Sequence, residues 1–556
     1  MEQKITGKQV AKGIMILTIA TFISKLVGVV YRIPIVNILG DAGNAIYGLA
    51  YQVYVLIITV SCLGIPNAVS KLIAECMSLK AYQDVKRIFR ITFIYTGIIS
   101  IVLAFGLWFG AEEIAHILKG GEDIVLPLKA LAPTVVVVSL MAVIRGYFQG
   151  LNDMMPTAIS QVIEQLFNAV FSVLLAAMFI PCGIGVAAMG STLGTGIGAL
   201  AGMVTIVVIY QCTYKKYNLE QVEEHYYIYP SNRSIIKQLL ITILPLVITA
   251  ALFALITLID NTMLFYYLPS TVDKLRSMGQ LSVIPVTDAI SMDTQTIVTS
   301  LSGQFLSKYT QFINIPVGII LVIVTSSIPA IAGDYARRDY KGLEHKMNRL
   351  LKMGMLIAMP ATVGLTLFGE PIMKLVYASA PDGGSLFTVG AIAIVFMTLA
   401  QLTAGMLQAI GKQHRVTLYV AIALLVKIVL NGLLLGNPNI HIYGITISTT
   451  ICYMIYTLFN MRALKKILQI KVNWKAVIIK PLICSVVMGI MSFYLYKVLL
   501  FIMSSLTYAI LLVIAFAIVT YACMTFFTHT ITIEDINYIP FLNKWNKKYM
   551  QTKTDK

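Results

Sequence analysis

Charged residues are scarce in this chain of 556 residues: Asp, Glu, Lys and Arg together make up 12% of it, about half the share found in soluble proteins. Hydrophobic residues make up 58% and gather in long runs separated by short polar segments. This pattern excludes an ordinary soluble domain. It predicts an all-α integral membrane protein that crosses the bilayer many times.

Motifs of soluble enzymes and metal proteins are also missing. The seven cysteines form no CxxC pair, so we expect neither a disulfide framework nor a metal site. No HExxH motif occurs, and the segment from Gly405 to Lys412 is one residue too long for a phosphate-binding loop. We therefore predict that the chain is not an enzyme and holds no metal or cofactor. A transporter without a nucleotide-binding domain must draw on a gradient, so coupling to Na⁺ or H⁺ stays open.

The apolar runs are long enough for about fourteen membrane spans, since one crossing needs about 20 residues. The predicted spans cover residues 10–38, 46–78, 87–110, 124–150, 156–181, 184–212, 235–268, 299–328, 345–368, 384–411, 415–436, 441–466, 475–500 and 504–528.

The net charge of +17 comes from basic residues that cluster in short loops between the spans. With fourteen spans the dense basic clusters fall on one side of the membrane, which the positive-inside rule makes the cytoplasmic side. We therefore predict a multi-pass membrane protein with both termini cytoplasmic. Anionic membrane lipids are the expected partners of these loops, and nucleic acid is not.

The two halves of the chain echo each other at a separation near 260 residues. Gly64-Ile65-Pro66 corresponds to Ser327-Ile328-Pro329, and Glu164 with Asn168 corresponds to Lys427 with Asn431. Internal repeats of this kind are common in transporters. We predict two six-helix lobes related by a pseudo-two-fold and two appended helices. The boundaries are 1–212 for the first lobe, 213–234 for a linker, 235–468 for the second lobe, 469–530 for the appended spans and 531–556 for a basic tail.

Charged side chains inside spans cost a few kcal/mol or more, which makes them functional candidates. Lys25, Arg32 and Arg145 could line a cavity for an anionic headgroup, because guanidinium and ammonium groups suit phosphate. The alternative is that these cations form structural ion pairs with acids on neighbouring helices. The predicted substrate-binding cavity contains Lys25, Arg32, Lys71, Glu75, Arg145, Gln149 and Glu164.

A second set of polar residues lies deep in the later spans. Asp260, Asn261, Lys427 and Asn431 could form a site that couples transport to an ion. The alternative is a buried ion pair between Asp260 and Lys427 that holds the second lobe together, and both roles fit a pair that forms in only one conformation.

Glycine recurs every fourth residue in the sixth predicted span, at Gly190, Gly194, Gly198 and Gly202. Such a ladder lies on one face of a helix and lets a neighbouring helix come close. We interpret it as a packing surface.

Several motifs resemble those of one group of bacterial exporters: Ser24-Lys25-Leu26-Val27-Gly28, Tyr31-Arg32-Ile33-Pro34, Arg145-Gly146-Tyr147-Phe148-Gln149-Gly150 and Val426-Lys427-Ile428-Val429-Leu430-Asn431. This group is the MurJ-like, stage V sporulation protein B-type polysaccharide exporter family of the multidrug/oligosaccharidyl-lipid/polysaccharide flippase superfamily. The resemblance extends over about residues 10–528.

The resemblance implies a fourteen-helix flippase that moves an undecaprenyl-pyrophosphate-linked cell-wall precursor, lipid II or a related oligosaccharide-lipid, to the outer leaflet by alternating access. It implies a lipid-linked glycan as substrate, cell-wall synthesis enzymes as potential partners and a location in the bacterial plasma membrane. Lys25 matches a basic cavity position of the family, whereas Tyr31 and Arg32 depart from its pattern. Asp260 and Asn431 match positions near the family's sodium site, where Lys427 replaces an uncharged residue.

Two other functions remain open at this stage. A multidrug–cation antiporter of the same superfamily would favour an acidic, aromatic-lined cavity, whereas the candidate lining here is basic. A non-transporting membrane scaffold for wall or spore-cortex synthesis would not need a cavity at all.

Overall fold

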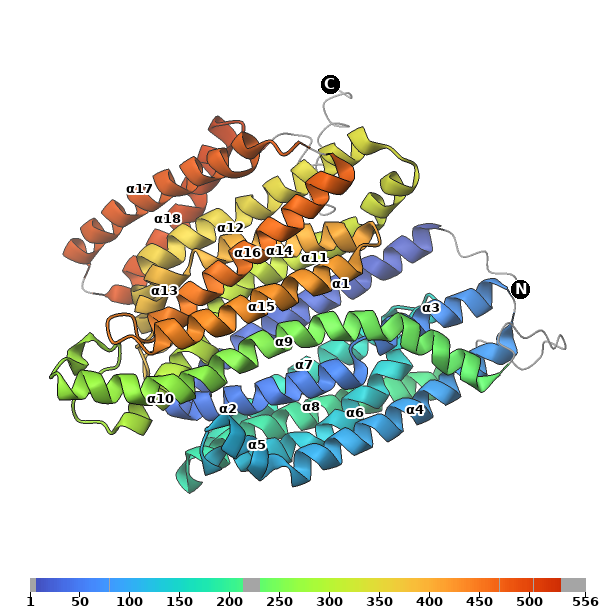
Figure 1. Ribbon diagram of the computed structural model, residues 1–556, viewed down its shortest axis with the longest axis horizontal. Helices are drawn as coiled ribbons and strands as arrows, with labels where there is room; N and C mark the ends of the chain where they lie inside the picture. Colours follow the sequence, from blue (N-terminus) through green and yellow to red (C-terminus); the bar gives the residue numbers. More distant parts are fainter. Residues whose placement is uncertain (1–6, 80, 214–230, 470, 504, 532–556) are drawn as a thin grey trace. The chain divides into compact units, whose positions relative to one another are not determined.

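The computed structural model describes residues 7–79, 81–213, 231–469, 471–503 and 505–531, and every regular element among them is a helix (Figure 1). The predicted all-α membrane fold is therefore confirmed. The predicted spans lie largely in helical segments, several of them are divided between two or more helices, and ten helical stretches are long and apolar enough to cross a membrane. The number of crossings stays a prediction. The predicted linker and basic tail lie almost entirely outside the described residues.

Two compact units divide the chain by their internal contacts. Unit 1 contains residues 1–311, 377–380 and 420–445, and unit 2 contains residues 312–376, 381–419 and 446–556. These units are defined by their internal contacts, and the boundaries of the predicted lobes stay a prediction.

Most of unit 1 is made by helices of the first half of the chain. They are α1 (Gly7–Val30), α2 (Arg32–Cys62), α3 (Ile65–Ser78), α4 (Tyr82–Phe109), α5 (Ala111–Leu118), α6 (Val125–Gly150), α7 (Met155–Phe179), α8 (Ile184–Thr213), α9 (Asn232–Ser277), α10 (Thr294–Gly303) and the π-helical segment η5 (Gln304–Tyr309), joined by most of α15 (Gln413–Leu435).

Unit 2 is built from later helices. They are α11 (Thr310–Ala336), α12 (Tyr340–Val376), α13 (Ser385–Gly390), α14 (Ala393–Ala409), α16 (Tyr443–Leu468), α17 (Lys480–Ile502) and α18 (Leu506–Phe527).

The chain folds back on itself within α2. Gly40 has a left-handed φ of 64° and interrupts the helical backbone, a conformation that glycine adopts without the steric cost of a Cβ. Asn44 donates a hydrogen bond to the carbonyl of Val36, eight residues earlier, at 3.3 Å. An unbroken helix would separate these residues by about 12 Å along its axis. The predicted first and second spans therefore meet at Gly40, and Arg32 comes to face residues well beyond the turn.

A second break separates α2 from α3, where one continuous span over 46–78 was predicted. The α2 helix ends at Cys62 and α3 begins at Ile65, with Pro66 in its first turn. Proline fits that position because it has no backbone N–H to place in a helical hydrogen bond. The break turns the end of the predicted span into a separate short helix.

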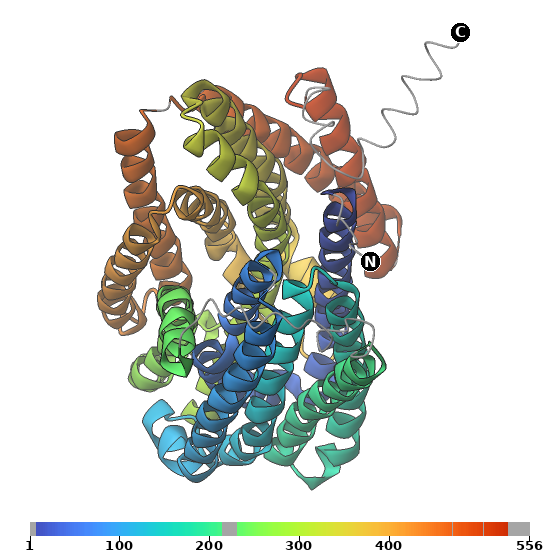
Figure 2. The ribbon, with the colours of Figure 1, turned by 90° about the vertical axis from the view of Figure 1, so that its right-hand side faces the viewer.

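Glycines of α8 pack directly against the backbone of α7, and the two helices run side by side in both views (Figures 1 and 2). A Cβ at Gly198 would lie 2.6 Å from the carbonyl oxygen of Glu164, and one at Gly190 would lie 2.7 Å from that of Leu175. At Gly194 it would overlap the backbone of Ser172. The predicted packing role of the glycine ladder is confirmed.

We expect Gly194→Ala to lower the stability of the protein by about 1–3 kcal/mol, because the added methyl group must push α7 and α8 apart. Thermal unfolding in detergent measures the effect. Gly106→Ala in α4 is the matched control, since a Cβ there meets no atom within 4 Å. Equal melting temperatures for the two variants would contradict the packing role.

Candidate functional site

Arg32 and Lys25 occupy different environments in unit 1. Arg32 is half-buried at the start of α2, and its guanidinium carbon lies 5.5 Å from the centre of the Tyr51 ring. Cation–π contacts of this kind contribute about 0.5–2 kcal/mol. Lys25 is exposed on α1, where its neighbour Ser24 is hydrogen-bonded to the carbonyl of Gln161 in α7. Of these two predicted cavity cations, Arg32 is the one held in place by a neighbouring side chain.

Arg145 is paired with an acid, as the structural interpretation anticipated. Its guanidinium lies 2.8 Å from Glu164 of α7, and its Nε donates a hydrogen bond to Ser160 at 3.1 Å. All three side chains come from facing turns of α6 and α7. The side chains of Arg145 and Glu164 keep 17% and 19% of their surface exposed, so the pair is also within reach of a ligand. Gln149, one turn further along α6, is half-buried.

The remaining predicted cavity residues lie on the short helix α3. Lys71 and Glu75 are both exposed there, one helical turn apart. Their assignment to the cavity stays a prediction.

Asp260 and Lys427 form a buried ion pair between α9 and α15. The ammonium lies 2.6 Å from one carboxylate oxygen, and Asn431 donates a hydrogen bond of 2.8 Å to the other. The side chains are only 4% and 1% exposed. Breaking such a pair by removing one partner costs about 3–5 kcal/mol, because the remaining charge is left buried.

Asn261 points away from this pair. Its amide donates to the carbonyl of Thr257 at 2.8 Å, and its oxygen accepts a hydrogen bond from Ser302 of α10 at 3.4 Å. Asn261 therefore ties α9 to α10 and is not a ligand of the Asp260 carboxylate. Among the described residues, no cluster of three His, Cys, Asp or Glu side chains is arranged to hold a metal ion.

A further buried cation was missed by the sequence interpretation. Lys308 in η5 is fully buried, lies 2.5 Å from a carboxylate oxygen of Asp41, and donates to the carbonyl of Ala380 at 2.6 Å. Nearby, Ser379 donates to the side-chain oxygen of Asn37 at 2.8 Å. The signal was available, because Lys308 is a charged residue inside a predicted span, like Lys25.

The π-helical segment brings Lys308 to Asp41. The backbone of Gly303, just before it, approaches that of Asp41 so closely that a Cβ would overlap it. Segments of π-helix are rare in proteins, and those that do occur are often found at functional sites. We call the set of Asn37, Asp41, Lys308, Ser379 and Ala380 the Lys308 contact.

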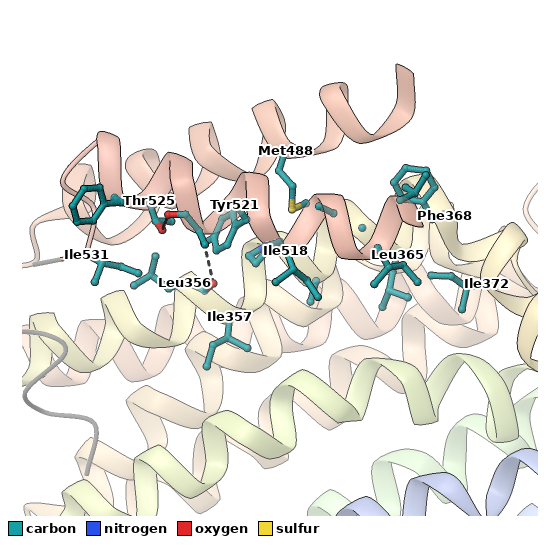
Figure 3. A pocket seen from close by; sticks show the side chains of 18 residues that line it. Leu356, Ile357, Leu365, Phe368, Ile372, Met488, Ile518, Tyr521, Thr525 and Ile531 are labelled. Carbon is teal, nitrogen blue, oxygen red and sulfur yellow. Dashed lines mark hydrogen bonds between the residues drawn. The ribbon is translucent and has the colours of Figure 1, made fainter. Parts of the chain in front are cut away.

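Unit 2 contains an apolar groove between α12, α17 and α18, with a volume of about 690 Å³ (Figure 3). Its walls include Leu356, Leu365, Met488 and Ile518. Tyr521 of α18 donates a hydrogen bond of 2.9 Å to the carbonyl of Leu356. That carbonyl is free because Pro360, four residues later, has no N–H to offer it. The proline in α12 thus creates the polar contact that fixes α18 beside the groove.

Two family models together match most of the chain. Residues 10–333 match the family model described as "Polysaccharide biosynthesis protein", and residues 300–433 match the MatE model. The first match covers more than half of the chain.

Two relatives from Bacillus subtilis (strain 168) align along most of their length. The chain is 25% identical to stage V sporulation protein B over 465 residues, which is 84% of this chain and 85% of that protein. It is 26% identical to lipid II flippase MurJ over 478 residues, 83% of each chain.

Solved structures of the same fold include lipid II flippase MurJ in an inward closed conformation. This structure has a TM-score of 0.67 at 16% identity, with 93% of this chain and 99% of that chain covered. An inward-facing multidrug resistance MATE family transporter of the MOP superfamily gives a TM-score of 0.61 at 16% identity, with 82% and 99% covered. At these identities the likeness shows the fold. Together with the family match, it establishes that the chain belongs to the polysaccharide biosynthesis protein family, the MurJ- and stage V sporulation protein B-related flippases of the MOP superfamily.

Proposed function

We propose that the protein is a flippase for an undecaprenyl-pyrophosphate-linked cell-wall precursor, lipid II or a related oligosaccharide-lipid, and that it works by alternating access. The proposal rests above all on the similarity to both Bacillus relatives over more than four fifths of each chain. One of these relatives carries the name of a lipid II flippase. Identity near 25% supports the transport class more strongly than the particular glycan.

The cations of unit 1 support an anionic headgroup. Arg32 and Arg145 both lie inside helices and both retain exposed surface. Placing charges there is costly in a membrane protein, and a guanidinium recognises phosphate through several directed hydrogen bonds. A pyrophosphate-linked sugar would carry the matching charge.

The groove of unit 2 supports a lipid tail. Its lining is almost entirely hydrocarbon and comes from α12, α17 and α18, the last two being the helices appended to the predicted lobes (Figure 3). An isoprenoid chain has no polar group to satisfy and fills such a surface by van der Waals contact alone. We assign the groove to the polyprenyl chain of the substrate.

A multidrug antiporter is the alternative function, and the MatE match with the MATE-type fold is the observation in its favour. Acidic side chains in a cavity strengthen the binding of a cationic drug, and unpaired cationic side chains weaken it. Arg32 is half-buried beside an aromatic ring with no acid in that contact, so its positive charge would repel a cationic drug.

The first prediction concerns Arg32 and Lys25. In proteoliposomes, Arg32→Ala should lower the rate at which lipid II reaches the outer leaflet by at least about tenfold, the loss expected for one charge-assisted contact. Arg32→Lys should retain more activity, since it keeps the charge. Unchanged flipping in both Arg32→Ala and Lys25→Ala would refute the pyrophosphate role. A gain in export of cationic drugs on Arg32→Ala would favour the antiporter.

The second prediction concerns the coupling ion. We propose that the Lys427 ammonium occupies the place beside Asp260 that a sodium ion would otherwise take, at 2.6 Å from the carboxylate. Sodium should then leave the melting temperature of the wild-type protein unchanged relative to choline. In Lys427→Ala, which leaves Asp260 and Asn431 without the ammonium, sodium should raise it.

The double variant Asp260→Asn with Lys427→Ala is the control, because it removes both charges and gives sodium nothing to bind. Stabilisation of the wild-type protein by sodium would contradict this assignment.

The third prediction concerns alternating access. The Lys308 contact joins α2, from the first six predicted spans, to η5 and residues 377–380, from the next six. We propose that it closes the outer side of the transporter and opens in each cycle. Lys308→Gln should therefore increase labelling of Ser379→Cys by a membrane-impermeant maleimide several-fold.

Lys374→Gln is the matched control, because its ion pair with Glu370 is exposed and lies within one helix. It should leave the labelling unchanged. Equal labelling with and without Lys308 would mean that the contact is no gate.

A further inference from the structure

A second apolar groove lies in unit 1 between α4 and α6, which pack side by side (Figure 1). Its volume is about 280 Å³, and all of its lining residues are apolar, among them Phe105, Trp108, Pro133 and Val136. Trp108 is 44% exposed and lies one residue before the end of α4. Because tryptophan is common where a helix leaves the hydrocarbon of a bilayer, the groove opens to lipid at one membrane interface, which the predicted topology makes the outer one.

A polar pocket with a volume of about 720 Å³ lies beyond the end of α4. It is lined by side chains of α5, of the short helix η1 (Glu122–Ile124) and of α10. Its polar lining residues are Glu112, His116, Lys119, Glu122 and Gln295. The ammonium of Lys119 also lies 4.2 Å from the centre of the Tyr266 ring in α9. Pockets of about 300–1,000 Å³ are typical of sites for small organic ligands.

The groove and the polar pocket follow one another along a single face of α6. Val125 lines the polar pocket, whereas Pro133 and Val136 line the groove. Lys129 lies midway between Val125 and Pro133, four residues from each. Residues three or four positions apart share one face of a helix, so these side chains form a continuous stripe from polar pocket to groove.

The opposite wall is also continuous, because helical hydrogen bonds run on from α4 into α5. The amide of Gly110 donates to the carbonyl of Gly106, and the amide of Ile114 donates to the carbonyl of Gly110, both at 2.9 Å. Trp108 in the groove and Glu112 in the polar pocket are therefore one helical turn apart.

An ion pair marks the junction of the two hollows. The ammonium of Lys129 lies 2.8 Å from a carboxylate oxygen of Glu112. This hydrogen bond and the charge of Lys129 hold the pKa of Glu112 below its usual value, so the carboxylate stays ionised. An apolar groove, a neutral ion pair and a polar pocket thus follow in the order in which a membrane lipid presents its tail and its headgroup.

The charges of the polar pocket restrict the headgroup. Glu112 and Glu122 carry two negative charges, and Lys119 and Lys129 carry two positive ones. An anionic headgroup would meet two carboxylates, and a cationic one would meet two ammonium groups. Carboxylates accept hydrogen bonds, ammonium groups donate them, and the amide of Gln295 does both. A sugar hydroxyl donates and accepts, so an uncharged sugar uses this mixed set fully.

We propose that the groove and the polar pocket together bind a neutral glycolipid of the surrounding membrane, with an acyl chain in the groove and the sugar in the pocket. The acyl chain needs only van der Waals contact. The sugar contacts α5, η1 and α10 at once and joins the ends of these helices. This site is separate from Arg32 and Arg145 and does not depend on the proposed transport substrate.

Trp108 provides a direct test with the full-length protein. The chain has three tryptophans, and replacing Trp474 and Trp545 by Phe leaves Trp108 as the only one. Bromine on an acyl chain quenches the fluorescence of a tryptophan that it touches. In phosphatidylcholine vesicles, brominated diglucosyl diacylglycerol should quench Trp108 at a several-fold lower mole fraction than brominated phosphatidylglycerol. Equal quenching by the two lipids would mean ordinary contact with the bilayer and would overturn the inference.

Two substitutions in the polar pocket test the sugar contacts. Glu122→Ala and Gln295→Ala should each weaken glycolipid binding about two- to tenfold, the effect of losing one hydrogen bond. Glu113→Ala is the matched control, because Glu113 is exposed on α5 beside Glu112 but does not line the pocket. It should bind like the wild type. Equal binding by all three variants would refute the sugar site.

A substitution in the groove tests the acyl chain. Val136→Phe narrows the groove and should reduce quenching of Trp108 by the glycolipid several-fold. Val102→Phe is the control, since Val102 lies on α4 outside the groove and is 63% exposed. A similar loss in both variants would be an effect of side-chain bulk on the surrounding lipid and would count against the groove.

Competition separates this site from the proposed transport site. Unlabelled diglucosyl diacylglycerol should displace the brominated glycolipid better than undecaprenyl pyrophosphate does. If undecaprenyl pyrophosphate is the better competitor, the hollow binds an anionic lipid and the glycolipid assignment is wrong. Either result leaves the flippase proposal standing, because that proposal is tested by transport in the Arg32 variants.

Discussion

A lysine inside a membrane helix must find an oxygen partner, and this constraint organises unit 1. Lys427 and Lys308 are almost completely buried, and each lies within 2.6 Å of an aspartate oxygen. Each aspartate comes from a different helix, so each pair joins segments far apart in the chain. Because an unpaired charge at such a depth costs several kcal/mol, these pairs favour one arrangement of α2, α9, η5 and α15 over the alternatives.

Arg32 and Arg145 keep part of their surface exposed, unlike the buried lysines. Arg32 faces an aromatic ring, and Arg145 shares a carboxylate while part of its surface remains exposed. A planar guanidinium can keep such a contact on one side and still donate several hydrogen bonds on another. The buried lysines therefore stabilise the conformation, and under the proposed function the arginines bind the substrate. This division explains how one membrane unit holds several cations without all of them being structural.

The sequence predicted the elements well because membrane helices are long and apolar. The predicted spans lie largely in helical segments, and the four-residue spacing of Gly190, Gly194 and Gly198 correctly indicated close helix packing. Pairing was harder to predict. Asp41 lies between the predicted spans 10–38 and 46–78, whereas the fold brings it to Lys308 more than 260 residues later. Such contacts depend on the three-dimensional path of the chain.

The hydroxyl of Tyr31 shows a second limit of sequence interpretation. The sequence gives Tyr31 a hydroxyl that can donate or accept, and only the fold shows that it accepts a hydrogen bond from Asn168, more than 130 residues later. Hydrogen-bond direction is a property of the network and is not visible in any single residue.

A flippase must bind its substrate on one side and release it on the other, so tight binding in itself gives no advantage. The aromatic contact of Arg32 bears on this balance. In the empty protein the Tyr51 ring stabilises the guanidinium by about 0.5–2 kcal/mol, which lowers the cost of leaving the cation without an anion. The net gain on binding phosphate is reduced accordingly. If the cargo is the proposed anionic lipid, a guanidinium that rests on an aromatic ring binds the anion less tightly than a bare guanidinium would, and this favours release.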